Sequence, residues 1–440
     1  MKTTWQASWS PSKTYPKLES HIAADVAIVG GGITGITLAY FLARAGKKVV
    51  VIEQGTLGES STTAYTTAFL TYEVDTELQD LERMFGAKKA DLVWQSGKDA
   101  IQSIEYIIRE ESIDCEFMRC DEYLFAAKQE EWQTIEQEAT HAQKAGYPLK
   151  IKNDPHKPED ELPFPNAGYV VIPNQAKFHP LKYIDGVRRA AEKHGAIFFE
   201  NTEVSSIEGN RPAIVYTKEG KGSVTAMWIT IATYNPFNQP HELFAKKGTY
   251  DSYIYELSIP RGALPEGLYL DGENPYHYFR VDAAPPSAAA AGSSGEYRNM
   301  NRDRFIIGGE DHRAEIRMDP KKNFAALLAY AKHILGDQPF EIVTKWTGPI
   351  LETLDGLPLI GSYSRKYPNR LVATGFSGNG MTYSMVAAVI LSDHILNKHS
   401  PYADLYDPKR HYPAYRLWLK FRDYAEELIH GALKNFFRKA

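Results

Sequence analysis

The stretch DVAIVGGGITGITLAYFLARAGKKVVVIE, residues 25–53, decides the fold of this chain. After Asp25 it opens with the short apolar run VAIV, residues 26–29, which is typical of a buried parallel strand. The glycine-rich segment GGGITG, residues 30–35, follows, and then come a helical pattern and a second apolar strand. The stretch therefore predicts a βαβ unit that opens a Rossmann-like domain.

Each glycine of the G-x-G-x-x-G spacing has its own expected role. Gly30 allows the tight strand-to-helix turn, Gly32 lets the backbone approach a pyrophosphate, and Gly35 lets the helix pack closely on the strand. The phosphates are expected at the helix N-terminus, where the dipole favours negative charge. Glu53 follows Gly35 by 18 residues, where an acid accepts hydrogen bonds from a ribose. The agreement of strand, helix and acid argues against a βαβ unit without a dinucleotide.

Composition limits the class of protein. A chain of 440 residues with 43% hydrophobic and 24% charged residues suits two or three soluble domains. The net charge of −5 gives no support for nucleic-acid binding. Cys115 and Cys120 are the only cysteines, too few for a zinc or iron–sulfur site, so no metal is expected. With no leader-like or membrane-spanning segment, a cytoplasmic location is expected.

A second strand–loop–helix pattern occurs much later, in ATGFSGNGMT at residues 373–382. Its glycines, at 375, 378 and 380, run into an apolar helical segment. A ligand held by both glycine loops must be long and polar at each end, and FAD suits this better than NAD. The hydroxyl-rich run SSTTAYTTA, residues 60–68, is expected to wrap such a ligand, although it also suits a capped helix start.

Further motifs appear in a fixed order along the chain: FHP at 178–180, ENTEV at 200–204, IAT at 231–233 and DGLPLIG at 355–361. With the two glycine loops, they make the chain resemble the FAD-dependent oxidoreductases of the D-amino-acid oxidase and glycine oxidase superfamily. TTAYTTAF, FHPLKY, GGEDH and LYDPKRH are similar to the branch that often carries a C-terminal Rieske domain.

The resemblance implies an α/β fold of the glutathione-reductase type. A Rossmann-like FAD-binding domain is expected from residues 1–75, 169–234 and 341–400. A mixed-sheet α+β substrate domain is expected from residues 76–168 and 235–340, with a C-terminal extension over 401–440.

The resemblance also implies non-covalent FAD and assigns its contacts. The pyrophosphate and ribose fall to the first glycine loop and Glu53, the ribityl chain and flavin to the hydroxyl-rich run, and the flavin O2 edge to the second glycine loop. The implied cofactor residues are Gly30, Gly32, Ile33, Thr34, Gly35, Glu53, Gln54, Ser61, Thr62, Thr63, Thr67, Ala68, Val204, Ala232, Thr233, Gly375, Gly378, Asn379, Gly380 and Met381.

Three departures from the family pattern leave the substrate open. The Cys/His pairs of a Rieske cluster are absent from these 440 residues. The amino-acid oxidases commonly have a carboxylate-binding Arg directly before a Pro, and this chain has Gly348 before Pro349. Phe69 stands where the related branch often has Lys. Covalent flavin through cysteine is not expected, because neither cysteine lies in a matching motif.

The family chemistry is oxidation of a C–N or C–O bond by hydride transfer to flavin N5, on a small amine, amino acid or hydroxy acid. Arg280 is the first candidate to bind a substrate carboxylate, since its planar fork matches that group, and a structural ion pair is the alternative. Tyr255 and His312 are the other catalytic candidates, with Tyr253 and Tyr276 as further pocket residues. His179, before a Pro at a helix start, is expected to be structural.

Two questions stay open at the level of sequence. The basic, amphipathic segment 415–439 suits a helix docked on its own body, a partner or dimer helix, or a peripheral membrane anchor. The electron acceptor is oxygen, a quinone or a protein carrier. The alternative functions are a flavin-binding subunit or assembly factor working with a separate Rieske-type or electron-carrier partner, and a nicotinamide dehydrogenase, which the second glycine loop disfavours.

Overall fold

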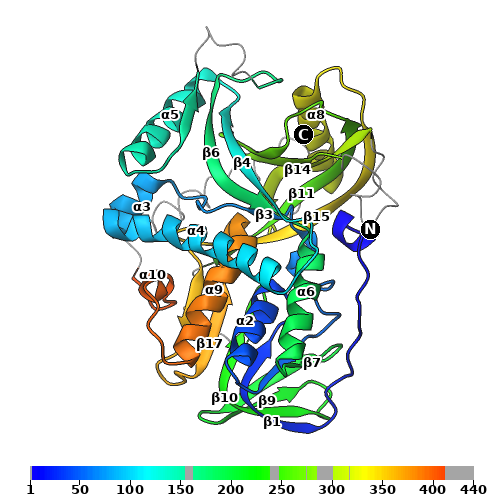
Figure 1. Ribbon diagram of the computed structural model, residues 1–440, viewed down its shortest axis with the longest axis vertical. Helices are drawn as coiled ribbons and strands as arrows, with labels where there is room; N and C mark the ends of the chain where they lie inside the picture. The colour runs from blue at the N-terminus through cyan, green and yellow to red at the C-terminus, as the bar shows by residue number, and fades with distance from the viewer. Residues whose placement is uncertain are drawn as a thin grey trace, which may run out of the picture.

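The computed structural model describes residues 2–153, 162–237, 247–273, 275–284, 301–316 and 318–411. Two sheets dominate these residues, and Figure 1 shows them one above the other, each with its own covering helices. Across the described part of the chain, the helices are all too short or too polar to span a lipid bilayer. The expected amphipathic segment 415–439 lies outside the described residues.

The first sheet is the parallel sheet that the opening stretch predicts. Its strands, in spatial order, are β16 (Leu359–Ser362), β17 (Arg370–Thr374), β10 (Ser223–Ile231), β1 (His21–Val29), β2 (Val49–Ile52) and β7 (Ile197–Phe199). All but the edge strand β16 run parallel. The hairpin β8 (Val204–Gly209) and β9 (Ala213–Thr217) extends it through an antiparallel pairing of β9 with β10.

Helices cover one face of this sheet (Figure 1): α2 (Ile33–Arg44), α6 (Pro180–Lys193) and α9 (Gly380–Ile395). The sheet is apolar on both faces, as a buried parallel sheet requires. Val26 and Ile28 point into the core under the helices, whereas Ala27 and Val29 join a second core with the β8–β9 hairpin. The carboxyl ends of β1, β2, β10 and β17 therefore meet at one edge, where ligands of such sheets bind.

The second sheet is mixed and largely antiparallel. Its strands, in spatial order, are β15 (Glu341–Thr353), β11 (Lys247–Pro260), β14 (Arg302–Arg313), β13 (His277–Asp282), β12 (Gly267–Asp271), β4 (Met118–Ala126), β6 (Gly168–Lys177) and β3 (Phe69–Leu70), with β5 (Lys150–Lys152) beside β6. The remaining helices are α1 (Thr4–Ala7), α3 (Leu78–Phe85), α4 (Ala87–Glu110), α5 (Gln129–Lys144), α8 (Pro320–Leu335) and α10 (Ala403–Tyr406), with short 3-10 turns η1 (Thr62–Tyr65) and η4 (Ser377–Asn379).

The expected domain boundaries need correction at three places. Residues 69–70, 168–177 and 341–353 were expected in or at the edge of the FAD-binding domain, but β3, β6 and β15 are strands of the second sheet. The reason is strand pairing: β6 pairs with β4, and β15 pairs along nearly its whole length with β11. After β1 and β2, the chain therefore returns to the parallel sheet only after Lys177 and, for the last time, after Thr353.

A buried histidine ties β12, β13 and α8 together. His277 lies against the carboxyl of Asp271 at 2.9 Å and that of Glu310 at 3.3 Å, and its ring stacks on Tyr330 at 3.7 Å. Burial alone would lower the pKa of His277, but the hydrogen bonds to Asp271 and Glu310 raise it to about 9. The imidazolium therefore stays charged in the folded protein at neutral pH.

This histidine predicts a pH dependence of stability. A raised folded-state pKa contributes stability that is complete below the unfolded value of about 6.5 and is lost as the pH rises through 9. We expect the unfolding free energy to fall by at most roughly 3 kcal/mol over that window, and the fall to disappear in His277→Gln. Urea unfolding at several pH values measures this. An equal decline in the variant would assign the effect to other groups.

Candidate functional site

A cleft lies at the carboxyl edge of the parallel sheet and is called here the dinucleotide cleft. Its volume is about 430 Å³, within the range of small-molecule sites. It is lined by the first glycine loop, the acid after β2, the hydroxyl-rich run, the start of β8, the end of β10 and the start of α9. The lining includes Gly30, Gly32, Ile33, Thr34, Glu53, Gln54, Ser61, Thr62, Thr63, Val204, Ala232, Thr233, Gly380 and Met381.

The first glycine loop has the shape that a bound pyrophosphate needs. Gly30 has φ +113°, and a Cβ there would lie 2.4 Å from the carbonyl oxygen of Ala232. A Cβ on Gly35 would lie 2.0 Å from the carbonyl oxygen of Gly30, so α2 packs directly on the turn. Gly32 is the N-cap of α2 and has no side chain to cap it, while Ile33 N donates to Thr63 Oγ1 of the hydroxyl-rich run at 3.2 Å. The helix N-terminus is therefore open toward the cleft, which suits an anion.

Glu53 occupies the predicted position and orders the loop around it. Its Oε2 accepts a hydrogen bond from Gly31 N at 2.7 Å, and its Oε1 accepts one from Gly55 N at 2.9 Å. The carboxylate is 6% exposed and lines the dinucleotide cleft. It can therefore present its remaining lone pairs to a ribose diol without moving.

A second cavity, called here the inner cavity, lies between the end of the dinucleotide cleft and the second sheet. Its lining comes from the hydroxyl-rich run and β3, from β4, β11, β12, β13 and β15, and from the second glycine loop. The two cavities share Thr62, Tyr234, Phe376, Gly380 and Met381 in their linings. They are therefore adjacent parts of one site with room for a long ligand.

The second glycine loop forms the wall that both cavities share. Asn379 is the N-cap of α9, again without a side-chain cap, and the buried Thr382 Oγ1 has no partner among the described residues. Gly378 N donates to Asp75 Oδ2 at 3.3 Å. Thr34 Oγ1 donates to Ser384 Oγ at 2.9 Å and joins α2 to α9. Two open helix N-termini thus face one continuous site.

Eighteen of the predicted cofactor residues line one or both cavities. Gly375, Gly378, Asn379 and Thr67 line the inner cavity, and the others named for the dinucleotide cleft line that cleft. Gly35 and Ala68 line neither: Gly35 packs against Gly30, and Ala68 is buried with φ +61°. The donor set and the open helix ends fit FAD, and Gly35 and Ala68 hold the backbone that surrounds it.

Two of the three catalytic candidates lie away from the inner cavity. Tyr255 packs against Phe324 of α8 at 5.3 Å, and His312 stacks on Tyr253 at 5.7 Å. The alternation of β11 explains this, because Ser252 and Ile254 line the cavity and the tyrosines point to the opposite face. Tyr276, named as a further pocket residue, does line the inner cavity, as does Tyr278.

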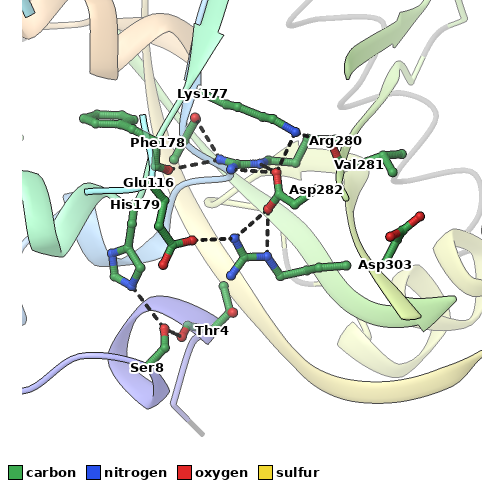
Figure 2. Close-up of polar contacts among 12 residues, drawn as sticks. Thr4, Ser8, Glu116, Lys177, Phe178, His179, Arg280, Val281, Asp282 and Asp303 are labelled. Atoms are coloured by element: carbon green, nitrogen blue, oxygen red, sulfur yellow. Dashed lines mark hydrogen bonds and ion pairs between the residues drawn. The ribbon is translucent and has the colours of Figure 1, made fainter. Parts of the chain in front are cut away.

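Arg280, the third candidate, is also outside the inner cavity and is fully engaged (Figure 2). Its Nη2 donates to Asp282 Oδ1 at 2.8 Å, and its Nη1 donates to the carbonyl oxygens of Thr67, Ala68 and Phe178 at 3.1–3.2 Å. The residue is 1% exposed. The structure therefore favours the ion-pair interpretation over a contact with substrate.

Asp282 is the centre of a buried charge cluster, which we define as Arg280, Asp282, Lys177, Arg304, Glu116 and Glu266. Lys177 lies 2.9 Å from Asp282 and Arg304 lies 2.6 Å from it. Lys177 also pairs with Glu266, and Arg304 with Glu116. Burial alone would raise the pKa of Asp282, but Arg280, Lys177 and Arg304 hold it well below its usual value.

His179 is structural, as its sequence context indicates. Its Nδ1 accepts a hydrogen bond from Lys182 N at 3.3 Å and so caps α6, and its Nε2 lies 3.0 Å from Ser8 Oγ (Figure 2). Burial lowers the pKa of His179 to about 3. A neutral ring that caps a helix and contacts the N-terminal arm has no free position for catalysis.

The inner cavity contains acids that the sequence analysis did not single out. Glu73, Asp75 and Glu122 line it, together with Tyr234. The available signal was Glu122, an acid at an inward position of the otherwise half-apolar strand β4. Glu73 and Asp75 lie in an irregular segment after β3, so no periodicity marks them.

Comparison with known proteins follows this geometry. The model of the family described as FAD dependent oxidoreductase matches residues 25–394. The "Putative Rieske 2Fe-2S iron-sulfur protein YhfW" of Bacillus subtilis (strain 168) is 32% identical over 99% of this chain and 81% of its own length. The gamma-glutamylputrescine oxidoreductase of Escherichia coli (strain K12) is 24% identical over 93% of this chain and 92% of its own.

A solved structure supports the same architecture. Glycine oxidase from Geobacillus kaustophilus matches with a TM-score of 0.70 at 20% identity, over 89% of this chain and 100% of that one. This likeness confirms the predicted fold class, an FAD-binding parallel-sheet domain joined to a mixed-sheet domain.

Two glycine substitutions should separate stability from cofactor binding. Gly35→Ala places a Cβ against backbone and should lower the unfolding free energy by about 1–3 kcal/mol. Gly32→Ala, whose Cβ would meet Ser61 only at 3.3 Å, should fold normally and bind FAD at least ~10-fold more weakly, because the methyl enters the cleft. Urea unfolding of the apoprotein and an FAD titration measure both. Unchanged FAD affinity in Gly32→Ala would contradict the assignment.

Arg280→Met tests the buried charge cluster. It removes one of three cations around Asp282 and five hydrogen bonds, and we expect a loss of about 3 kcal/mol in unfolding free energy. Arg280→Lys should recover part of that loss. If instead stability is unchanged and only affinity for carboxylate-bearing substrates falls, Arg280 would be a substrate ligand.

Proposed function

Since the chain belongs to the family of FAD-dependent oxidoreductases, we propose that it oxidises the C–N bond of a small amine or amino acid by hydride transfer from the substrate carbon to flavin N5. It is a flavoprotein and an oxidoreductase of the kind that acts on C–N bonds. The bond order of C–N rises from one to two as a hydride leaves carbon and a proton leaves nitrogen, and FAD accepts the two electrons.

One observation carries this proposal: the dinucleotide cleft and the inner cavity meet at the N-terminus of α9. The residues of this chain would bind the adenosine and pyrophosphate in the first and leave the second for the flavin ring and substrate. Aromatic and apolar side chains of the inner cavity, among them Tyr276, Tyr278 and Ile254, would position the substrate and exclude water.

Non-covalent attachment through this site is part of the proposal. Cys115 is buried, burial raises the pKa of its thiol to about 12, and Cys120 behaves in the same way. Neither cysteine lines the dinucleotide cleft or the inner cavity. A thiol that stays protonated and lies outside the site is a poor nucleophile for a flavin.

The alternative is a flavin-binding subunit that passes electrons to a separate carrier. The Rieske name of the Bacillus subtilis relative, of which this chain covers 81%, supports an iron–sulfur protein as the electron carrier. In this alternative the same two cavities hold FAD, and the acceptor is a protein instead of oxygen or a quinone.

A spectroscopic experiment tests both versions. Purified protein should be yellow and contain one FAD per chain, and an anaerobic screen of amines, amino acids and hydroxy acids should bleach the flavin with at least one amine or amino acid. Protein that remains colourless and takes up no FAD would end both versions. Bound FAD that no compound bleaches would favour the subunit.

A further inference from the structure

The inner cavity is acidic beside the second glycine loop, where Asp75 Oδ2 accepts a hydrogen bond from Gly378 N and the main-chain oxygen of Glu73 accepts one from Asn379 Nδ2. Glu73, Asp75 and Glu122 line it, and none of its described lining residues is Lys, Arg or His. Asp311 and Glu352 act on the same region: Asp311 is hydrogen-bonded to Ser252 and Tyr276 and feels the charges of Glu352 and Asp75. A bound carboxylate would be repelled here, because charges interact strongly where water is excluded.

Glu122 and Glu73 form a buried pair in which each carboxyl has one oxygen without a hydrogen-bond donor among the described residues. Glu122 is 2% exposed on β4, and its Oε2 has no hydrogen-bond donor among the described residues, nor has Oε1 of Glu73. Gln175 Nε2 donates to the other oxygen of Glu73 at 3.0 Å. Burial raises the pKa of both carboxyls, and the charge of Glu73 raises that of Glu122 further. Without a ligand, the pair can be satisfied by a proton that the two carboxyls share.

Nearby cations do not neutralise this pair directly. Lys98, which acts on Glu73 from a distance, lies over the rings of Tyr72 and Tyr147 at 4.9 and 4.1 Å. Arg280 is held by Asp282 and three carbonyl oxygens. Two buried carboxyls in an apolar wall are costly unless a cation or proton joins them.

On these grounds we propose that the inner cavity recognises its substrate through an ammonium group other than the reacting nitrogen, and that Glu73 and Glu122 bind this group. The substrate class is an aminoalkyl cation such as an α,ω-diamine. This inference rests on the proposed function and specifies its substrate. An ammonium group has three N–H donors, and it meets Glu73, Glu122 and the unpartnered Oδ1 of Asn379 as acceptors.

The rest of the inner cavity suits the remainder of such a molecule. Val74, Ile254, Leu351 and Tyr278 also line the cavity and suit a methylene chain. Gly348, at the position where the amino-acid oxidases place their carboxylate-binding Arg, lines this cavity as well and supplies no charge.

Ligand binding to the FAD-loaded protein tests the inference. Ligand binding is followed by the change that it causes in the flavin spectrum. We expect the dissociation constant of 1,4-diaminobutane to be at least ~10-fold lower than that of butylamine, and 4-aminobutanoate and glycine to bind more weakly than either. Anaerobic bleaching of the same samples gives the rate of reduction. Glu122→Gln and Glu73→Gln should each weaken the diamine at least ~10-fold and change butylamine less than ~3-fold.

Controls make every outcome decisive. Glu219→Gln, an exposed acid paired with Lys17 far from the cavity, should leave all four ligands unchanged. If Glu122→Gln does not fold, Glu73→Gln tests the same contact. The inference would be overturned if glycine or 4-aminobutanoate bound more tightly than the diamine, or if both variants bound the diamine as tightly as the unchanged protein. Neither result would contradict C–N oxidation. A diamine that binds tightly and bleaches nothing, with no other compound active, would overturn the proposed reaction and leave the binding site.

Discussion

The pairing of Arg280 with Asp282 is the interaction on which the two halves of the molecule depend. Arg280 belongs to β13 of the mixed sheet, but its guanidinium donates to Thr67 and Ala68 beside the cofactor site and to Phe178 at the entrance to α6. A buried charge of this kind is stable only when every donor has an acceptor. The position of the hydroxyl-rich run relative to the mixed sheet is therefore fixed within hydrogen-bonding distance.

That constraint explains why two loops more than 300 residues apart form one site. The first glycine loop is positioned by β1 and α2, and the second by β17 and α9. The contact of Thr34 with Ser384 links the helices, and Arg280 holds the segment between the loops from the other side. Each helix N-terminus then faces the same elongated ligand. The negatively charged groups of the ligand, its phosphates among them, therefore bind where the helix dipoles favour negative charge.

The sequence predicted the parts of the site that depend on local geometry. Gly30, Gly32 and Glu53 are separated by spacings that only one strand–turn–helix unit satisfies, and the structure has that unit. For Arg280 the sequence left open whether it binds substrate or forms an ion pair. A single residue on a strand does not indicate which residues from other elements will surround it in the fold. Tyr255 lies outside the inner cavity for a related reason. The alternation along β11 predicts that the strand has two faces, but it does not show which face lines a cavity. Glu73 and Glu122 meet only because β3 and β4 both pair with β6, which is not visible in either segment alone.

The domain boundaries were misplaced for the same physical reason. β6 and β15 lie where the FAD-binding segments 169–234 and 341–400 were expected to begin, but their partners β4 and β11 belong to the other sheet. Long antiparallel pairings are set by contacts distant in sequence, and local patterns carry little information about them.

The N-terminal arm has a consequence for how the protein is made. Trp5 is fully buried: its indole N–H donates to the carbonyl oxygen of Thr66, and its ring lies near His179, Arg280 and Arg304. The contacts of Trp5 are therefore complete only after Arg304 has been synthesised, and the second glycine loop lies later still in the chain. The arm and the FAD site thus reach their final form only when most of the described chain is present.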